Sequence, residues 1–421
     1  MGANMGTMTR RGFLHTAFSS CAGFAATGTM GAFRGFGSPQ DSFSPQTSQR
    51  VFSDLHVHYR LLKGLQSVPL TKMVQEGVGA MINEFSATEV DWAECHRKGV
   101  DLLCISHYNP IDEWFPEPLS QGAAASNNVL RIMDLVEREL RGEDEKDEKK
   151  KPSQYARVVR NYSELCTALG TSKTDQSYRI KVVHTLEGSH SLGGKLEALQ
   201  EFADRGVALI GLTHYFDKSV AASATALPIL PDSRNPSEKD GLTGFGKEVI
   251  HEMERLGLIV DVTHCSSYSV ADVLRTVSKP FVASHSSVKT LGEHPSSLLE
   301  EHIQEISRRG GLIGVALHPF VQSNFIGLPI IKEQGSLQDV VRAVRHLYKI
   351  CGTHKHLGIG SEFAGFMLGP KDMRKLSQID KLQKLLLAEF NDEDMVKDIM
   401  ANNVIDFLLR NWRSGNPVHE K

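Results

Sequence analysis

Short runs of apolar, β-branched residues recur along the chain, and segments with helical periodicity lie between several of them. In residues 241–257 the apolar side chains form one stripe, and Gly257 stands where a helix commonly ends. Residues 128–142 have the same pattern. Strands that alternate with helices predict a parallel sheet, and eight such units predict a closed α/β barrel. The eight runs expected to form strands are 51–58, 100–107, 180–187, 207–214, 258–264, 280–285, 312–318 and 357–363.

Nearly all of these runs finish on a histidine or a carboxylate. The carboxyl ends of the strands form the catalytic face of parallel α/β barrels, so these side chains are expected to meet at one mouth. His56 and His58, two residues apart on one strand, should point to the same face. A single terminal histidine more often bonds a loop backbone, and His107 and His318 are left out of the predicted site for that reason. The terminal residues are His58, His107, Glu187, His214, His264, His285, His318 and Glu362.

The donor types predict metal-assisted chemistry. Imidazole nitrogens combined with carboxylate oxygens suit Zn²⁺, and also Mn²⁺, Fe²⁺ or Co²⁺. One carboxylate can bridge two ions that lower the pKa of a shared water, and another can take up the proton of that water. Glu187 is the candidate bridge and Glu362 the candidate proton carrier. The residues therefore suit the hydrolysis of a carbonyl compound.

Composition adds limits to this interpretation. The chain has 421 residues, of which 40% are hydrophobic and 23% charged, as in soluble globular proteins. A net charge of −3 without a basic stripe gives no reason to expect nucleic-acid binding. The six cysteines lack the spacing of a disulfide framework or a cysteine-based zinc site. No stretch approaches the ~18 consecutive apolar residues that cross a bilayer, so no transmembrane segment is expected.

The N-terminal part of the sequence predicts export. Adjacent arginines in TRRGFL, residues 9–14, precede a mildly apolar stretch, and residues 1–33 resemble a twin-arginine signal for the periplasm. The alternative is a disordered basic N-terminus. Cys21 offers a lipidation site, but Phe18 is a poor start to such a signal, so anchoring is not expected. The expected segments are a linker at 34–50, a hydrolase barrel at 51–412 with a solvated, mobile charged insertion at 141–152, and a tail at 413–421.

Seven motifs follow one another along the chain: HTLEGSHSLGG, GLTHYFDKS, GLTGFGKEVIHEMERLGLIVDVTHCS, PFVASHSS, GGLIGVALHPF, HLGIGSEFAG and FNDEDMVKDIMANNVIDFLLRNW. In order and approximate spacing they resemble the renal-type membrane dipeptidases, a zinc metallopeptidase family of the amidohydrolase superfamily. The resemblance covers most of residues 51–412. It implies a distorted (β/α)8 TIM-like barrel with two divalent metal ions, expected to be Zn²⁺. The family often forms homodimers, whereas the sequence itself offers no interface argument.

The resemblance also implies roles for single residues. His214 matches the histidine that polarises the scissile carbonyl and steadies the oxyanion, a role that needs preorganised donors. Glu362 matches the carboxylate that transfers the proton. The implied metal ligands are His56, His58, Glu187, His264 and His285.

Three positions depart from the family pattern. The first motif usually reads His-x-Asp, and here His58 replaces an anionic ligand with a neutral one. The last strand usually ends in DFDG, and here EFAG gives Glu362 a longer side chain and removes a carboxylate at Ala364. The family places an arginine near Ser296 to grip the terminal carboxylate of the substrate. Ser296 cannot form that contact, and Lys289 offers only a point charge in its place.

The preferred interpretation is an exported, metal-dependent hydrolase that cleaves an amide bond of a small dipeptide-like substrate with a metal-activated water. The missing arginine keeps open an amidohydrolase that acts on another amide or a lactone. A third interpretation is a catalytically impaired binding protein on a decayed barrel. All five ligand positions keep donor side chains, which argues against this decay.

Overall fold

The computed structural model describes residues 50–59, 90–109, 112–113, 125–215, 219–224, 240–292, 296–317, 335–365 and 369–413. Several expectations from the sequence therefore lie outside the described residues. These are the export signal with Cys21, most of the linker, His318, and the tail beyond residue 413.

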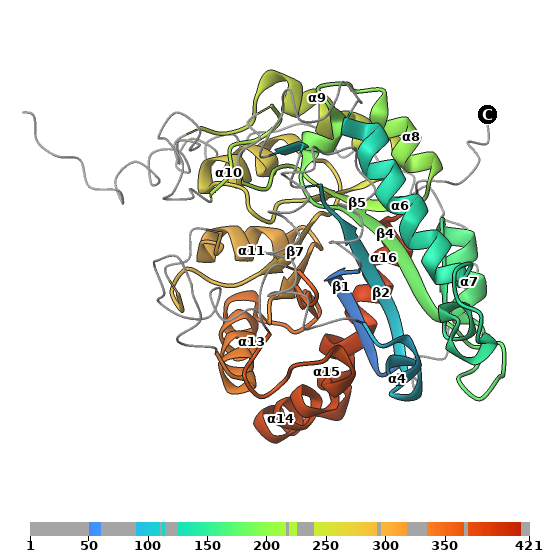
Figure 1. Cartoon of the computed structure of the whole chain (residues 1–421). Coiled ribbons are helices and arrows are strands. Elements are labelled where there is room, and N and C mark those ends of the chain that lie inside the picture. The colour runs from blue at the N-terminus through green and yellow to red at the C-terminus, as the bar shows by residue number, and fades with distance from the viewer. Residues whose placement is uncertain are drawn as a thin grey trace, which may run out of the picture. The chain divides into compact units, whose positions relative to one another are not determined.

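Eight parallel strands form a closed barrel, as predicted from the sequence (Figure 1). They are β1 Phe52–His58, β2 Val100–His107, β4 Ile180–Leu186, β5 Val207–Gly211, β6 Ile259–Asp261, β7 Val282–Ser286, β8 Leu312–Val315 and β9 Leu357–Ile359. Neighbours pair in the order β2-β1-β9-β8-β7-β6-β5-β4. Residues 102–107 of β2 then pair with 181–186 of β4 and close the ring. Each predicted run coincides with one of these strands, although several strands are shorter than the run and β7 extends one residue beyond it, to Ser286.

A ninth strand, β3 Ala156–Val158, was not predicted and lies outside the ring. It pairs with residues 180–182 of β4, while β5 pairs with residues 184–186. Three residues are too few to show the alternation that marks a strand in a sequence. The charged run 141–152 precedes β3, and within it lies the short 3-10 helix η2 Glu148–Lys150, while η3 Pro152–Gln154 follows directly.

Helices pack around the barrel, and their apolar sides face it. Helix α9 begins after its N-cap Thr243 and ends at Gly257, which has a φ of 74°, as the sequence pattern predicts. Among the described residues, no helix has the length and apolar character needed to cross a membrane. The α-helices are α4 Trp92–Arg97, α6 Ala125–Arg141, α7 Tyr162–Leu169, α8 Ala198–Asp204, α9 Gly244–Leu256, α10 Ser267–Thr276, α11 Glu300–Arg308, α13 Leu337–Cys351, α14 Asp380–Phe390, α15 Glu393–Lys397 and α16 Asn403–Asn411.

The interior of the barrel is a packed core beneath the mouth. Strand residues such as Leu55 and Val183 are fully buried and cluster with Val404 and Leu408 of α16. Arg50, two residues before β1, bonds Asp406 of α16 at 2.9 Å, which places this helix at the amino ends of the strands. One end of the barrel is thus sealed by apolar packing, and the polar residues collect at the other end.

Candidate metal centre

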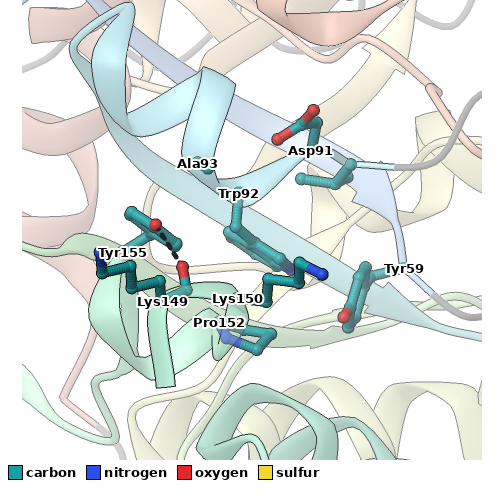
Figure 2. Close-up of a pocket in the computed structure, with 9 residues that line it drawn as sticks. Tyr59, Asp91, Trp92, Ala93, Lys149, Lys150, Pro152 and Tyr155 are labelled. Carbon is teal, nitrogen blue, oxygen red and sulfur yellow. Dashed lines mark hydrogen bonds between the residues drawn. The ribbon is translucent and has the colours of Figure 1, made fainter. Parts of the chain in front are cut away.

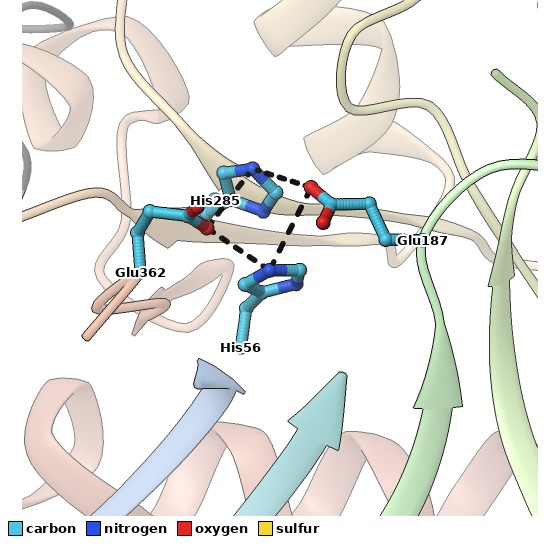
Figure 3. Close-up of side chains that lie close together, drawn as sticks. All are labelled: His56, Glu187, His285 and Glu362. Atoms are coloured by element: carbon cyan, nitrogen blue, oxygen red, sulfur yellow. Dashed lines mark ion pairs between the residues drawn. The ribbon is translucent and has the colours of Figure 1, made fainter. Parts of the chain in front are cut away.

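Histidines and carboxylates from six strand ends converge at the mouth of the barrel, as the sequence predicts. Figure 3 shows His56, Glu187, His285 and Glu362 turned toward one another. A second group joins Glu187 to His214 and His264. In each group one donor atom from every member lies within 4.8 Å of the others. Glu187 belongs to both groups, and this is the arrangement that a carboxylate bridging two cations requires.

The first group gathers around the carboxylate of Glu362. Its Oε2 lies 3.0 Å from Nε2 of His56 and 3.4 Å from Nε2 of His285. Oε1 of Glu187 is 3.8 Å from the same atom of His56 and 3.6 Å from that of His285. Glu362 therefore lies at least as close to His56 and His285 as the predicted ligand Glu187 does. The sequence analysis, in contrast, predicts a proton-transfer role for Glu362.

The second group gathers around Oε1 of Glu187. Nε2 of His264 lies 3.1 Å from this oxygen, and Nε2 of His214 lies 3.7 Å from it. His264 and His285 bring their Nε2 atoms within 3.1 Å of each other. This contact joins the two groups into one continuous cluster.

His58, the first departure from the family pattern, lies between the two carboxylates. Its Nε2 is 3.4 Å from Oε2 of Glu187 and 3.5 Å from Oε1 of Glu362, and 3.3 Å from Nε2 of His56. The side chain is buried. Strand β1 thus delivers both histidines to one face, as the alternation of a strand requires.

The donor set fits divalent cations of the zinc type. The Nε2 atoms of His56 and His58 face each other, as do those of His264 and His285. A neutral imidazole carries a proton on only one nitrogen, so facing pairs beside two carboxylates offer more lone pairs than protons. Oε2 of Glu362 is buried without a hydrogen-bond donor among the described residues. Divalent cations that take nitrogen and oxygen ligands would bind the lone pairs of these imidazoles and carboxylates.

The charges of the cluster depend on one another. Burial acts to lower the pKa of His56, but Glu362 and Glu187 raise it to about 9. Burial acts to raise the pKa of Glu362, but His285, His56 and His58 bring it well below its usual range. The pKa of Glu187 is likewise well below its usual range, because His214, His264 and His56 together outweigh burial. Both carboxylates are therefore anionic at neutral pH and attract cations.

Unusual backbone conformations aim two of these side chains. His264 and Glu362 have φ values of 65° and 61°, which non-glycine residues rarely adopt, and Ala364 has 57°. Such strain concentrates at functional sites. Gly365 completes the turn, since a Cβ there would lie 2.8 Å from Oε1 of Glu362. The EFAG segment thus folds tightly around its carboxylate.

A second layer of polar contacts orients the histidine rings. Oγ of Ser284 lies 3.0 Å from Nδ1 of His285 and 3.4 Å from Nδ1 of His56. Oδ1 of Asp54 accepts the backbone N–H groups of His56 and Ser361, at 3.1 and 2.8 Å. Contacts of this kind fix which nitrogen a histidine presents to a metal.

Glu113 contacts His214 and was missed by the sequence analysis. Its Oε2 lies 3.0 Å from Nδ1 of His214, on the side of the ring away from Glu187. Burial acts to lower the pKa of His214, but Glu187 and Glu113 raise it. The only signal in the sequence is a carboxylate in the segment that follows β2, and nothing in the sequence relates it to a histidine 101 positions later.

The side chain of His107, which the sequence analysis leaves out of the site, contacts a second histidine. Its Nε2 lies 2.7 Å from Nδ1 of His184, and Nε2 of His184 lies 3.2 Å from Oε1 of Glu137 on α6. The carbonyl of His107 accepts the N–H of Glu187 at 3.1 Å. The residue therefore contacts the cluster through its backbone, at the closing seam of the barrel.

Ser296 and Lys289, the two predicted substrate contacts, lie in the segment after β7. The carbonyl of Ser296 accepts from Oγ of Ser286 at 3.3 Å, and the N–H of Lys289 donates to the carbonyl of Leu298 at 2.8 Å. These contacts fix the backbone of the segment, and the role of the two side chains toward a substrate stays a prediction.

A separate cavity of about 280 Å³ lies beside α4 (Figure 2). No predicted site residue lines it, although Tyr59 directly follows His58. Its lining consists of Tyr59, Val90, Asp91, Trp92, Ala93, Lys149, Lys150, Pro152 and Tyr155. The metal cluster is therefore not part of this cavity.

Solved structures of low sequence identity share the fold. An amidohydrolase from Pseudomonas aeruginosa superimposes with a TM-score of 0.62 at 17% identity, covering 87% of this chain and 97% of that chain. A metallopeptidase from Rhodobacter sphaeroides, liganded with a phosphinate mimic of the dipeptide L-Ala-D-Ala, gives 0.60 at 19% identity and covers 86% and 100%.

Sequence comparisons give the family. Two Schizosaccharomyces pombe proteins, both named uncharacterized dipeptidases, are 30% and 27% identical over 237 and 240 residues, or 56% of this chain. The chain spans about half the length of these curated relatives, 53% and 54%. A model of the membrane dipeptidases (peptidase family M19) matches residues 49–416. The chain therefore belongs to the membrane dipeptidase family.

Proposed function

We propose that this protein is a metal-dependent hydrolase that cleaves an amide bond of a small, dipeptide-like substrate. The observation that carries the proposal is the sharing of Glu187 by two groups of potential metal ligands at the barrel mouth. Membership of the membrane dipeptidase family supports it. So does the matching fold of a Rhodobacter sphaeroides metallopeptidase whose ligand mimics a dipeptide.

The proposed division of roles is the one that the family resemblance implies, and the proximity of the side chains supports it. His56, His58, His264 and His285 would hold two divalent ions, expected to be Zn²⁺, with Glu187 between them. When bound, such ions lower the pKa of a water and polarise a carbonyl oxygen.

Two further residues would act on the substrate. The Glu362 carboxylate takes the proton of the attacking water and gives it to the leaving amine. His214, whose Nε2 lies 3.7 Å from Oε1 of Glu187, stabilises the negative charge that develops on the carbonyl oxygen.

Metal analysis and substrate turnover test the proposal together. The purified protein should contain two metal equivalents, and it should hydrolyse dipeptides until a chelator removes the metal and Zn²⁺ restores it. Glu187→Gln should retain less metal and lose at least about 100-fold in kcat/KM, which corresponds to about 2.7 kcal/mol. Glu197→Gln, at an exposed position before α8, should change neither. A folded protein that binds no metal would contradict the proposal.

Ser296 favours a second candidate, a hydrolase that acts on another amide or on a lactone. A serine cannot match a carboxylate with the two parallel hydrogen bonds that an arginine forms. The substrate panel should therefore include N-acyl amino acids and lactones. Turnover of these without any turnover of free dipeptides would favour the second candidate. Metal binding without turnover of any compound would favour a catalytically impaired binding homologue.

We also propose that the chain is exported to the periplasm through the twin-arginine motif in residues 9–14. Replacement of Arg10 and Arg11 by lysine should keep the protein out of the periplasmic fraction of expressing cells. A protein whose distribution does not change on this replacement would contradict the proposal.

A further inference from the structure

Three hydrogen-bond donors surround the carboxylate of Glu113. Oε2 receives the hydroxyl of Tyr108 at 2.6 Å and faces Nδ1 of His214 at 3.0 Å. Oε1 accepts the N–H of Tyr215 at 2.6 Å. The carboxyl group is buried, and its pKa lies below the usual range because His214, His190 and Tyr108 together outweigh the effect of burial. Glu113 is therefore an anionic acceptor with no proton to donate.

This acceptor decides which nitrogen of His214 carries a proton. A carboxylate can only accept, so Nδ1 of His214 must donate to it. Nε2, on the opposite side of the ring, then points toward Oε1 of Glu187 at 3.7 Å. Without Glu113, the proton of the neutral ring could occupy either nitrogen.

Aromatic contacts hold the ring of His214 in this orientation. The ring of Tyr108 lies 4.4 Å away at an interplanar angle of 71°, and that of Tyr215 lies 3.8 Å away at 57°. The carbonyl of His214 also accepts a short hydrogen bond from Ser223. Both the backbone and the ring are thus fixed, and Tyr108 and Tyr215 contact Glu113 as well as the ring.

We propose that Glu113 is a positioning residue that fixes the Nδ1–H form and the ring orientation of His214, so that Nε2 alone faces the reacting carbonyl. The catalytic consequence rests on the proposed function, whereas the hydrogen-bond assignment does not. In the neutral Nδ1–H ring Nε2 has no proton, so His214 donates to the carbonyl oxygen only when Nε2 also carries a proton. The ring is then an imidazolium whose charge is balanced by the Glu113 carboxylate. The same contact therefore also supports the donor role proposed for His214.

The chain offers a matched pair of variants on adjacent residues. In Glu113→Gln the side-chain oxygen can still accept from Tyr215, and the amide then donates to Nδ1 of His214 and reverses its proton position. Asp112→Asn is the control, because the Asp112 carboxylate accepts hydrogen bonds from the side-chain amides of Asn109 and Asn128 and not from His214.

Spectroscopy gives a test that is independent of activity. Long-range ¹H–¹⁵N spectra of the ¹⁵N-histidine-labelled protein report the protonation of each ring nitrogen, and His214→Gln assigns the signals. Nδ1 of His214 should be protonated in wild type and in Asp112→Asn. In Glu113→Gln it should move to the unprotonated range. An unchanged signal in Glu113→Gln would overturn the proposal.

Kinetics test the catalytic consequence. Glu113→Gln should lower kcat by about 10–100-fold, as partners of active-site histidines commonly do, with KM within about twofold and metal content unchanged. Glu113→Asp, which keeps the carboxylate, should recover part of the loss, and Asp112→Asn should stay near wild type. Equal kcat in Glu113→Gln and Asp112→Asn would overturn the positioning role. A wild type without turnover would contradict the proposed function and leave the spectroscopic test standing.

Discussion

The hydroxyl of Ser284 lies 3.0 Å from Nδ1 of His285, while Nε2 of the same ring lies 3.1 Å from Nε2 of His264. The serine therefore contacts the nitrogen of His285 that faces away from the metal cluster. It also lies 3.4 Å from Nδ1 of His56, so one side chain orients two rings.

We predict that Ser284→Ala lowers metal affinity by about 10–100-fold, because both rings lose the partner that fixes their orientation. Competition against a chelator of known affinity would measure the change. Ser286→Ala, on the same strand and face, is the control, since its hydroxyl bonds backbone carbonyls of Ser287 and Ser296. Equal affinities in the two variants would show that the hydroxyl of Ser284 does not orient the ligands.

Ser296→Arg is predicted to lower KM for dipeptides with a free carboxylate, because guanidinium and carboxylate form paired, charge-assisted hydrogen bonds. The expected change is about tenfold, with kcat within about twofold, since the interaction is made in the ground state and the transition state alike. Steady-state kinetics on a dipeptide and on its C-terminal amide would measure it. Ser296→Gln adds bulk without charge and should not change KM, and a similar fall in KM for the amide would contradict recognition of the carboxylate.

Glu137 on α6 is predicted to stabilise the closing seam of the barrel. Its carboxylate contacts Nε2 of His184 at 3.2 Å and the guanidinium of Arg160 at 2.5 Å, and its side chain is 8% exposed. Glu137→Gln should lower the free energy of unfolding by about 1–3 kcal/mol, measured by urea denaturation. Asp134→Asn, also on α6, breaks an exposed pair with Arg205 after α8 and should cost at most about 1 kcal/mol. A loss no larger than this at Glu137 would contradict the prediction.

His302 on α11 is predicted to make stability depend on pH. Burial lowers its pKa to about 4, against the partial effect of Glu301, whereas an unfolded histidine titrates near 6.5. Between these values the unfolded chain binds a proton that the folded protein excludes, so stability falls as the pH falls from 6.5 to 4.

Replacement of His302 by leucine should therefore shrink the difference in unfolding free energy between pH 7 and pH 5. The expected reduction is about 2 kcal/mol, from about 1.4 kcal/mol per pH unit. Urea denaturation at the two pH values measures it. His251→Gln, at an exposed position on α9, should leave the difference as in wild type. A His302→Leu variant with the wild-type difference would refute the assignment.

The barrel and its cluster of polar residues could be predicted because their signals are local. Each strand is a short apolar run, and its last residues already show the donor, as in HVH at His58 or VASH at His285. Parallel strands bring their carboxyl ends to one mouth, so the topology supplies the long-range contacts.

The remaining features depend on contacts that no local pattern encodes. Glu113 reaches His214 across 101 positions, and β3 is too short to alternate. The left-handed conformation of Glu362 has no signal in the sequence, because glutamate rarely adopts it. That turn places Glu362 3.0 Å from His56, among the candidate ligands.

The direct pairing of β2 with β4 means that the wall of the barrel is complete without the segment between α6 and β4. Most side chains of residues 143–150 are exposed, and β3 pairs only with residues 180–182 of β4, on the edge opposite β2. A reporter domain or an immobilisation tag spliced into this stretch would therefore leave every strand of the ring hydrogen-bonded to its neighbours. Residues 143–150 thus offer protein engineers an attachment point at which the barrel wall stays closed.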